Sequence, residues 1–87
     1  MGITKIELLP IKPQNGLIAF ASVEIDDQFY VGSIGVHRKR DGAGYRITYP
    51  TRKVGEHNLT ICHPTEPRLS KEIEQAICIK AEEVLGL

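Results

Sequence analysis

The sequence of 87 residues lacks any long apolar run, and this absence bears on where the protein works. A membrane-spanning helix needs about 18 or more consecutive apolar residues, and no segment approaches that length. The opening residues, Met-Gly-Ile-Thr-Lys-Ile-Glu, contain no long apolar core of the kind that a secretory signal peptide needs. We therefore expect no membrane partner and a cytoplasmic location.

Cysteine is scarce, and its two occurrences, Cys62 and Cys78, do not form a CxxC pair. In the reducing cytoplasm, such cysteines are expected to be free thiols. The histidines, His37, His57 and His63, also lack the paired spacing that zinc ligands show. The expectation is a protein with no bound metal, no disulfide and no other cofactor.

Patterns typical of catalysis and nucleotide binding are absent as well. Cys62 and His63 are adjacent, and adjacent strand residues point to opposite faces, so they do not make a nucleophile and its base. The glycines follow neither the Walker spacing nor the dinucleotide fingerprint, and they fall between the expected strands. We expect no enzymatic activity and no small-molecule substrate.

The chain does contain enough apolar residues for one core. Its 41% hydrophobic and 25% charged residues are ordinary for a globular protein. A chain this short buries only about 60% of its unfolded surface and cannot divide its apolar residues between two cores. We expect a single domain over residues 1–87.

Alternating apolar and polar residues predict an antiparallel sheet of about five strands. Prolines at positions 10 and 13 cannot donate to a ladder, so residues 10–16 are predicted to be a loop that turns at Asn15-Gly16. Asp26-Asp27 is predicted to be the next turn, and residues 50–58 a polar loop. The predicted strands span residues 3–9, 17–26, 29–37, 45–49 and 59–63.

One helix is predicted over about residues 67–85, because Pro67 is tolerated only in a first turn. At 100° per residue, its apolar stripe contains Leu69, Ile73, Ala76, Ile77 and Val84. The fold class is therefore α+β, a small antiparallel sheet followed by one C-terminal helix packed on it.

Some apolar residues fall outside the surfaces that this helix and sheet would bury against each other. Ile18 and Phe20 give the start of strand 17–26 a second apolar face, and Cys78 and Leu85 lie nearly opposite the helix stripe. Because the chain is short and carries these extra surfaces, we expect a homodimer with Ile18, Phe20, Cys78 and Leu85 in its interface.

Charge has no overall excess, since 11 Lys and Arg balance 11 Asp and Glu. Its distribution is uneven: residues 37–57 hold six basic and two acidic residues, while the rest of the chain holds five basic and nine acidic ones. Two basic loops could meet at one edge of the sheet to contact nucleic-acid phosphates, with Tyr45, Tyr49 and His57 close enough in sequence to add stacking. The basic residues of the segment are Arg38, Lys39, Arg40, Arg46, Arg52 and Lys53.

A resemblance over nearly the whole chain, from Ile3 to the C-terminal helix, depends on the order and spacing of five segments: residues 3–8, 17–26, 27–31, 49–53 and 61–65. They read Ile-Thr-Lys-Ile-Glu-Leu, Leu-Ile-Ala-Phe-Ala-Ser-Val-Glu-Ile-Asp, Asp-Gln-Phe-Tyr-Val, Tyr-Pro-Thr-Arg-Lys and Ile-Cys-His-Pro-Thr. Together they resemble the SpoVG family, the stage V sporulation protein G or septation-regulator family of bacteria.

The resemblance implies a homodimer built on a β-sheet with a C-terminal helix. It also implies a DNA- and RNA-binding regulator of gene expression, connected with septation and sporulation. The proline-then-basic loop of the family matches Pro50, Thr51, Arg52 and Lys53, so the resemblance implies that these residues contact nucleic acid.

Two functions therefore stay open. The first is a dimeric nucleic-acid-binding regulator that uses its basic loops. The alternative is a non-catalytic protein-interaction module whose charged loops only keep it soluble. Salt separates the two, because phosphate contacts weaken steeply as salt rises and an apolar interface hardly responds.

Overall fold

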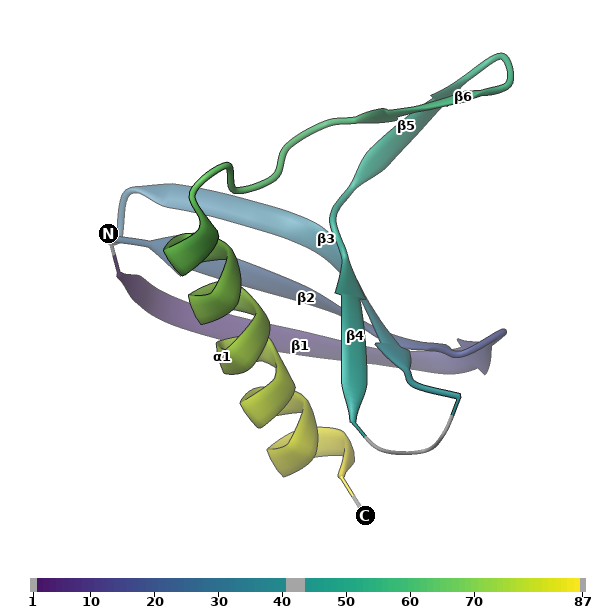
Figure 1. Cartoon of the computed structure of the whole chain (residues 1–87). Helices are drawn as coiled ribbons and strands as arrows, with labels where there is room; N and C mark the ends of the chain where they lie inside the picture. Colours follow the sequence, from purple (N-terminus) through teal and green to yellow (C-terminus); the bar gives the residue numbers. More distant parts are fainter. Residues whose placement is uncertain (1, 41–43, 87) are drawn as a thin grey trace.

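A computed structural model describes residues 2–40 and 44–86, and it consists of a sheet, a helix and a projecting hairpin (Figure 1). The main sheet is antiparallel in the order β1-β2-β3-β4, and helix α1 covers one of its faces. This arrangement confirms the predicted α+β class. The elements are β1 (Ile3–Gln14), β2 (Leu17–Ile25), β3 (Phe29–Arg38), β4 (Tyr45–Thr48), β5 (Thr51–Val54), β6 (His57–Thr60) and α1 (Pro67–Leu85).

The core lies between the main sheet and α1. Its apolar side chains come from the inward positions of β2 and β3 and from the inner face of the helix, as the two periodicities require. Ile34 from β3 and Ile77 from α1 are both fully buried in it. Burial of this kind stabilises the fold by about 1.5–3 kcal/mol for each large aliphatic side chain. The buried residues are Ala19, Ala21, Val23, Ile25, Val31, Ile34, Val36, Ile73, Ile77 and Ala81.

Helix α1 confirms Ile73 and Ile77 as inward residues, but its buried arc differs from the predicted stripe. Val84 is 48% exposed, so its assignment to the stripe is wrong. Cys78 and Leu85 are half-buried instead of lying on the back of the helix, because α1 reaches both edge strands of the sheet. The Cys78 thiol donates to the Tyr45 carbonyl oxygen at 3.6 Å.

The first hairpin is longer than predicted. β1 continues to Gln14 through both prolines, so the predicted loop over residues 10–16 is wrong. An edge strand tolerates proline because its outer N–H groups have no ladder partner, and the pairing is irregular between Pro10 and Gln14. The turn itself is confirmed at Asn15-Gly16, with φ angles of 51° and 91°.

The second predicted turn is also confirmed, since Asp26 and Asp27 both have a φ of 54°. On the strand between the two turns, a register shift from Leu17 to Ala19 changes the alternation. Ile18 consequently packs against the buried cluster, whereas Phe20 remains 38% exposed on the other face.

Residues 51–60 form a second, two-stranded sheet, which we call the arm. The arm projects away from the main sheet and α1 (Figure 1). The predicted loop at 50–58 and the predicted strand at 59–63 are therefore wrong. The polar composition of β5 concealed its strand character, and the turn is made at Gly55, whose φ of 63° suits glycine.

Candidate nucleic-acid interface

Four basic side chains gather at one end of the main sheet, in a group that we call the sheet-end cluster. Arg38 ends β3, Lys39 and Arg40 follow it, and Arg46 lies on the neighbouring strand β4. All four are exposed. They surround a shallow hollow of about 520 Å³ that Asn15, Gly16 and His37 also line.

Backbone hydrogen bonds fix the main chain from which the side chains of this cluster extend. The Arg38 amide donates to the Gly16 carbonyl oxygen at 2.9 Å, which ties the end of β3 to the first turn. The Lys39 amide donates to the Gly44 carbonyl oxygen at 3.1 Å. The backbone is thus fixed on both sides of the cluster, while the long cationic side chains are exposed to solvent.

His37 adds a titratable group to the hollow. Its Nε2 lies 3.1 Å from the Thr48 hydroxyl, and its cross-strand neighbour is Arg46. Partial burial, together with the positive charge of Arg46, lowers the pKa of His37 below its ordinary value of 6.5. A phosphate in the hollow would act in the opposite direction and favour the charged imidazole.

The arm carries the other two predicted contacts, Arg52 and Lys53, both exposed on β5. Directly paired residues of an antiparallel hairpin share a face. Arg52 pairs with Leu59, and Lys53 pairs with Asn58. The two basic side chains therefore point to opposite faces of the arm, and Thr51 shares the face of Lys53.

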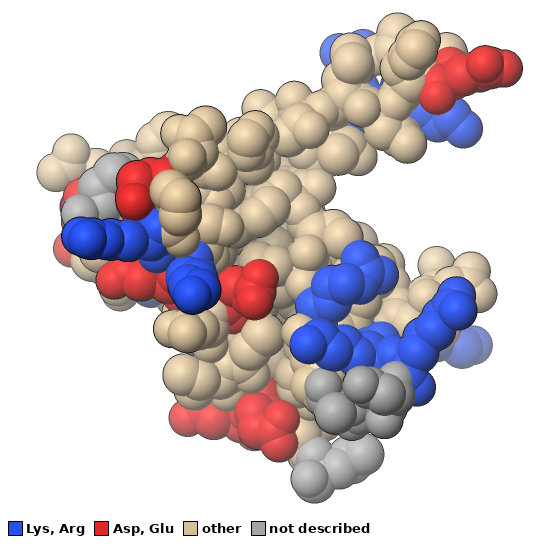
Figure 2. Space-filling view, in the orientation of Figure 1, with Lys and Arg blue, Asp and Glu red and all other residues tan. Residues whose placement is uncertain are grey.

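The sheet-end cluster and the arm lie apart. The cluster lies where β4 begins, and the arm starts beyond the end of β4, so the strand separates them (Figure 1). Figure 2 shows Lys and Arg side chains on the projecting arm and, apart from them, in a group beside the start of β4, with a further group over the start of α1. The expectation that both basic loops meet at one edge is wrong within a single chain.

The aromatic residues of the basic segment do not lie on either basic surface. Tyr45 and Tyr49 are half-buried and pack against the core cluster. Burial, with the charge of Glu74, raises the pKa of the Tyr49 hydroxyl. The hollow instead includes His37, which is on β3 itself, and Asn15 and Gly16. The sequence did not indicate Asn15 and Gly16, because the first hairpin brings them beside β3 from a distant part of the chain.

Cys62 and Cys78 are free thiols in the structure. Across residues 2–40 and 44–86, three or more His, Cys, Asp or Glu side chains nowhere gather in a way that would hold a metal ion. In the same residues, no helix combines the length and the apolar character needed to cross a membrane.

The family model for SpoVG matches residues 1–83 of this chain. The chain belongs to the SpoVG family. The matched span contains the whole main sheet, the arm and nearly all of α1. A comparison with curated proteins found no match. Membership of the SpoVG family supports a role as a SpoVG-like regulator.

Proposed function

We propose that this SpoVG-family protein is a non-catalytic, dimeric regulator of gene expression in the cytoplasm, and that it contacts DNA or RNA through its basic side chains. The sheet-end cluster is the observation that carries the proposal. Arg38, Lys39, Arg40 and Arg46 surround one hollow, and no acidic residue is among the described residues that line it. An exposed surface of one charge suits a polyanion.

The expected affinity is modest and depends on salt. Phosphate contacts release counterions, so the binding constant falls with salt in proportion to the number of phosphates neutralised. A dimer presents each cluster twice. Two phosphate contacts per subunit would give a slope of about −3.6 in a plot of log K against log salt on duplex DNA.

The test is a binding titration of the purified protein against random DNA and RNA pools at several salt concentrations. We expect binding at low salt that weakens with a slope of about −3.6 for two contacts per subunit, or about −5.4 if Arg38, Arg46 and Lys53 all make contacts. If neither nucleic acid binds at low salt, the nucleic-acid role fails. The protein-interaction module would then be the better reading, since several large apolar side chains are exposed, among them Leu9, Tyr30 and Ile79.

A further inference from the structure

The arm has no core of its own. All eight residues of β5 and β6 are exposed, and the strands pair with each other instead of joining the main sheet. A single two-stranded hairpin is at best marginally stable in water. An ordered arm therefore calls for a surface on which it can pack.

The two faces of the arm differ in chemistry. Arg52 pairs with Leu59 and Val54 pairs with His57, so these four side chains share one face of the arm. The Ile61 amide donates a hydrogen bond to the Pro50 carbonyl oxygen, which extends the hairpin and places Ile61 on the same face. Val54, Leu59 and Ile61 are 49%, 52% and 62% exposed, which leaves an apolar stripe in solvent. We call the face with these three side chains, Arg52 and His57 the apolar arm face. The opposite face carries only Thr51, Lys53, Asn58 and Thr60.

The main sheet also has an uncovered apolar surface, on the face turned away from α1. Leu9 pairs with Phe20 there, and Tyr30 lies beside them over Gly32. Leu9 is 67% and Tyr30 66% exposed, and the residues border a hollow of about 440 Å³. We call Leu9, Phe20, Tyr30, Glu7 and Glu24 the open sheet face.

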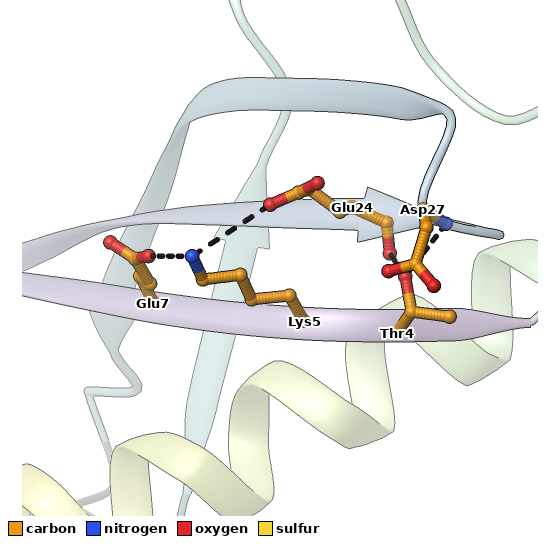
Figure 3. Close-up of polar contacts among 5 residues, drawn as sticks. All are labelled: Thr4, Lys5, Glu7, Glu24 and Asp27. Atoms are coloured by element: carbon orange, nitrogen blue, oxygen red, sulfur yellow. Dashed lines mark hydrogen bonds and ion pairs between the residues drawn. The ribbon is translucent and has the colours of Figure 1, made fainter.

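The charges of the open sheet face are acidic on balance. Lys5 Nζ lies 3.0 Å from Glu7 Oε1 and 4.0 Å from Glu24 Oε2, so one cation is shared between two carboxylates (Figure 3). The apolar arm face, by contrast, carries Arg52 and no acidic residue. The two surfaces are therefore complementary in both apolar character and charge.

We propose that the apolar arm face of one chain packs on the open sheet face of a second copy, and that the second copy returns the same contact. The arm projects away from its own main sheet, so the complementary surface that it meets belongs to another chain (Figure 1). A two-fold axis makes one pair of surfaces sufficient for a closed dimer. This inference rests on the dimer of the proposed function and names its interface.

The contact gives the two basic residues of the arm different roles. Arg52 lies within the interface, where the partner's acidic surface compensates its charge. Lys53 stays on the outer face with Thr51, and this face is the one that remains available for phosphate. Neighbours in sequence thus serve dimerisation and nucleic-acid binding separately.

The first test compares Leu59→Asp with Asn58→Asp, which place the same charge on opposite faces of one strand. We expect Leu59→Asp to raise the dimer dissociation constant about 100-fold or more, because the contact would bury an unpaired carboxylate. Asn58→Asp should keep the dimer mass in analytical ultracentrifugation. Circular dichroism should show both variants folded, since the core around Ile34 and Ile77 is untouched.

The second test examines the receiving surface with Leu9→Asp and Ile79→Asp. Leu9 and Ile79 are 67% and 64% exposed, on the open sheet face and on the back of α1. We expect Leu9→Asp to dissociate the dimer and Ile79→Asp to leave it intact. The reverse result would place the interface on the helix and overturn the inference.

The outcomes separate this inference from the proposed function. A parent dimer that stays dimeric with Leu59→Asp refutes the arm contact, while salt-sensitive nucleic-acid binding by the same parent would leave the regulator role standing. A parent that is monomeric at micromolar concentration refutes the arm contact and the dimer together. Failure of the parent to bind DNA or RNA bears on the regulator role alone.

Discussion

The main sheet and α1, which we call the body, differ from the arm in how they become ordered. The body places ten apolar side chains between a sheet and a helix, and it closes its core within one chain. The arm uses similar β-branched and aliphatic residues, yet none of its strand residues is buried. Hydrophobic stabilisation depends on area removed from water, so the body has its own source of stability and the exposed strands of the arm lack one within the described chain.

The largest expected difference between the two regions is in the response to truncation. Ile77→Ala should lower the free energy of unfolding by about 2–5 kcal/mol, because Ile77 is fully buried and the cavity cannot collapse completely. Leu59→Ala on the arm should change the unfolding of the isolated subunit by about 0.5 kcal/mol or less. Urea unfolding at a concentration where the subunits are separate measures both values. Equal losses would mean that the arm is part of the body's cooperative unit.

Glycine substitutions are expected to give a smaller difference in stability between the two regions. A Cβ at Gly35 would lie 2.6 Å from the Thr48 hydroxyl and 3.1 Å from His37 Nε2, so Gly35→Ala should destabilise the body by about 1–3 kcal/mol. A Cβ at Gly55 would meet open space, and its φ of 63° strains only the arm turn. At a concentration where the subunits are separate, thermal unfolding of Gly55→Ala should therefore resemble that of the parent. A large loss there would contradict the independence of the arm.

The same contrast explains how much of the fold the sequence could predict. The periodic spacing of apolar residues identified β2 and the helix, because each element buries one face within the chain. Ala21 on β2 and Ile73 on α1 are examples of these buried residues. It missed β5, whose residues, such as Arg52, are exposed and carry no inward pattern. The prolines of β1 led to the wrong prediction of a loop over residues 10–16. Proline has no N–H to donate, which breaks a central strand but is tolerated in an edge strand such as β1.

The candidate site was predicted unevenly for a related reason. The excess of basic residues indicated Arg38 as part of a loop, but it ends β3, next to His37, which pairs with Arg46 on β4. Arg38 and Arg46 lie apart from Lys53 because β4 starts at the cluster and ends before the arm. Local composition does not show where a strand starts and ends. Asn15 and Gly16 reach the hollow only through the long-range pairing of β2 with β3.

Binding measurements can compare the two basic regions directly. Removing two phosphate contacts from each subunit of a dimer should flatten the log-log salt slope by about 3.6, the change expected for Arg38→Ala/Arg46→Ala. Lys53→Ala removes one contact per subunit and should flatten the slope by about 1.8. Both variants should keep the dimer mass. Arg52→Ala should act differently, by weakening the dimer before it changes the slope.

Matched controls make that comparison strict. Lys71→Ala removes one positive charge from α1, in a hollow whose lining includes no residue of the sheet-end cluster or the arm, and should leave the salt slope as it is in the parent. If it flattens the slope as much as Lys53→Ala, the binding responds to total charge and not to the arm. If only the sheet-end variant matters, nucleic acid contacts the body alone.

The smallest expected effect is on the pH dependence of stability, through His37. Its pKa is lowered in the folded body, by partial burial and then by Arg46, whereas the unfolded chain keeps the ordinary value of 6.5. Between the lowered pKa and 6.5, the unfolded state binds more protons, so stability falls as the pH decreases through this window. Below the lowered pKa, both states are protonated and the loss levels off.

His37→Gln should remove this pH-dependent component, because glutamine keeps a polar group near Thr48 without a titrating proton. The parent should therefore lose more stability than the variant between pH 7.5 and pH 5, as seen in their urea midpoints. His57→Gln is the matched control, since His57 lies on the arm and does not contribute to unfolding of the body. The same pH profile for the parent and His37→Gln would show that folding does not lower the pKa of His37. Added nucleic acid should reduce the difference, because a phosphate beside Arg46 offsets the charge that opposes protonation of His37.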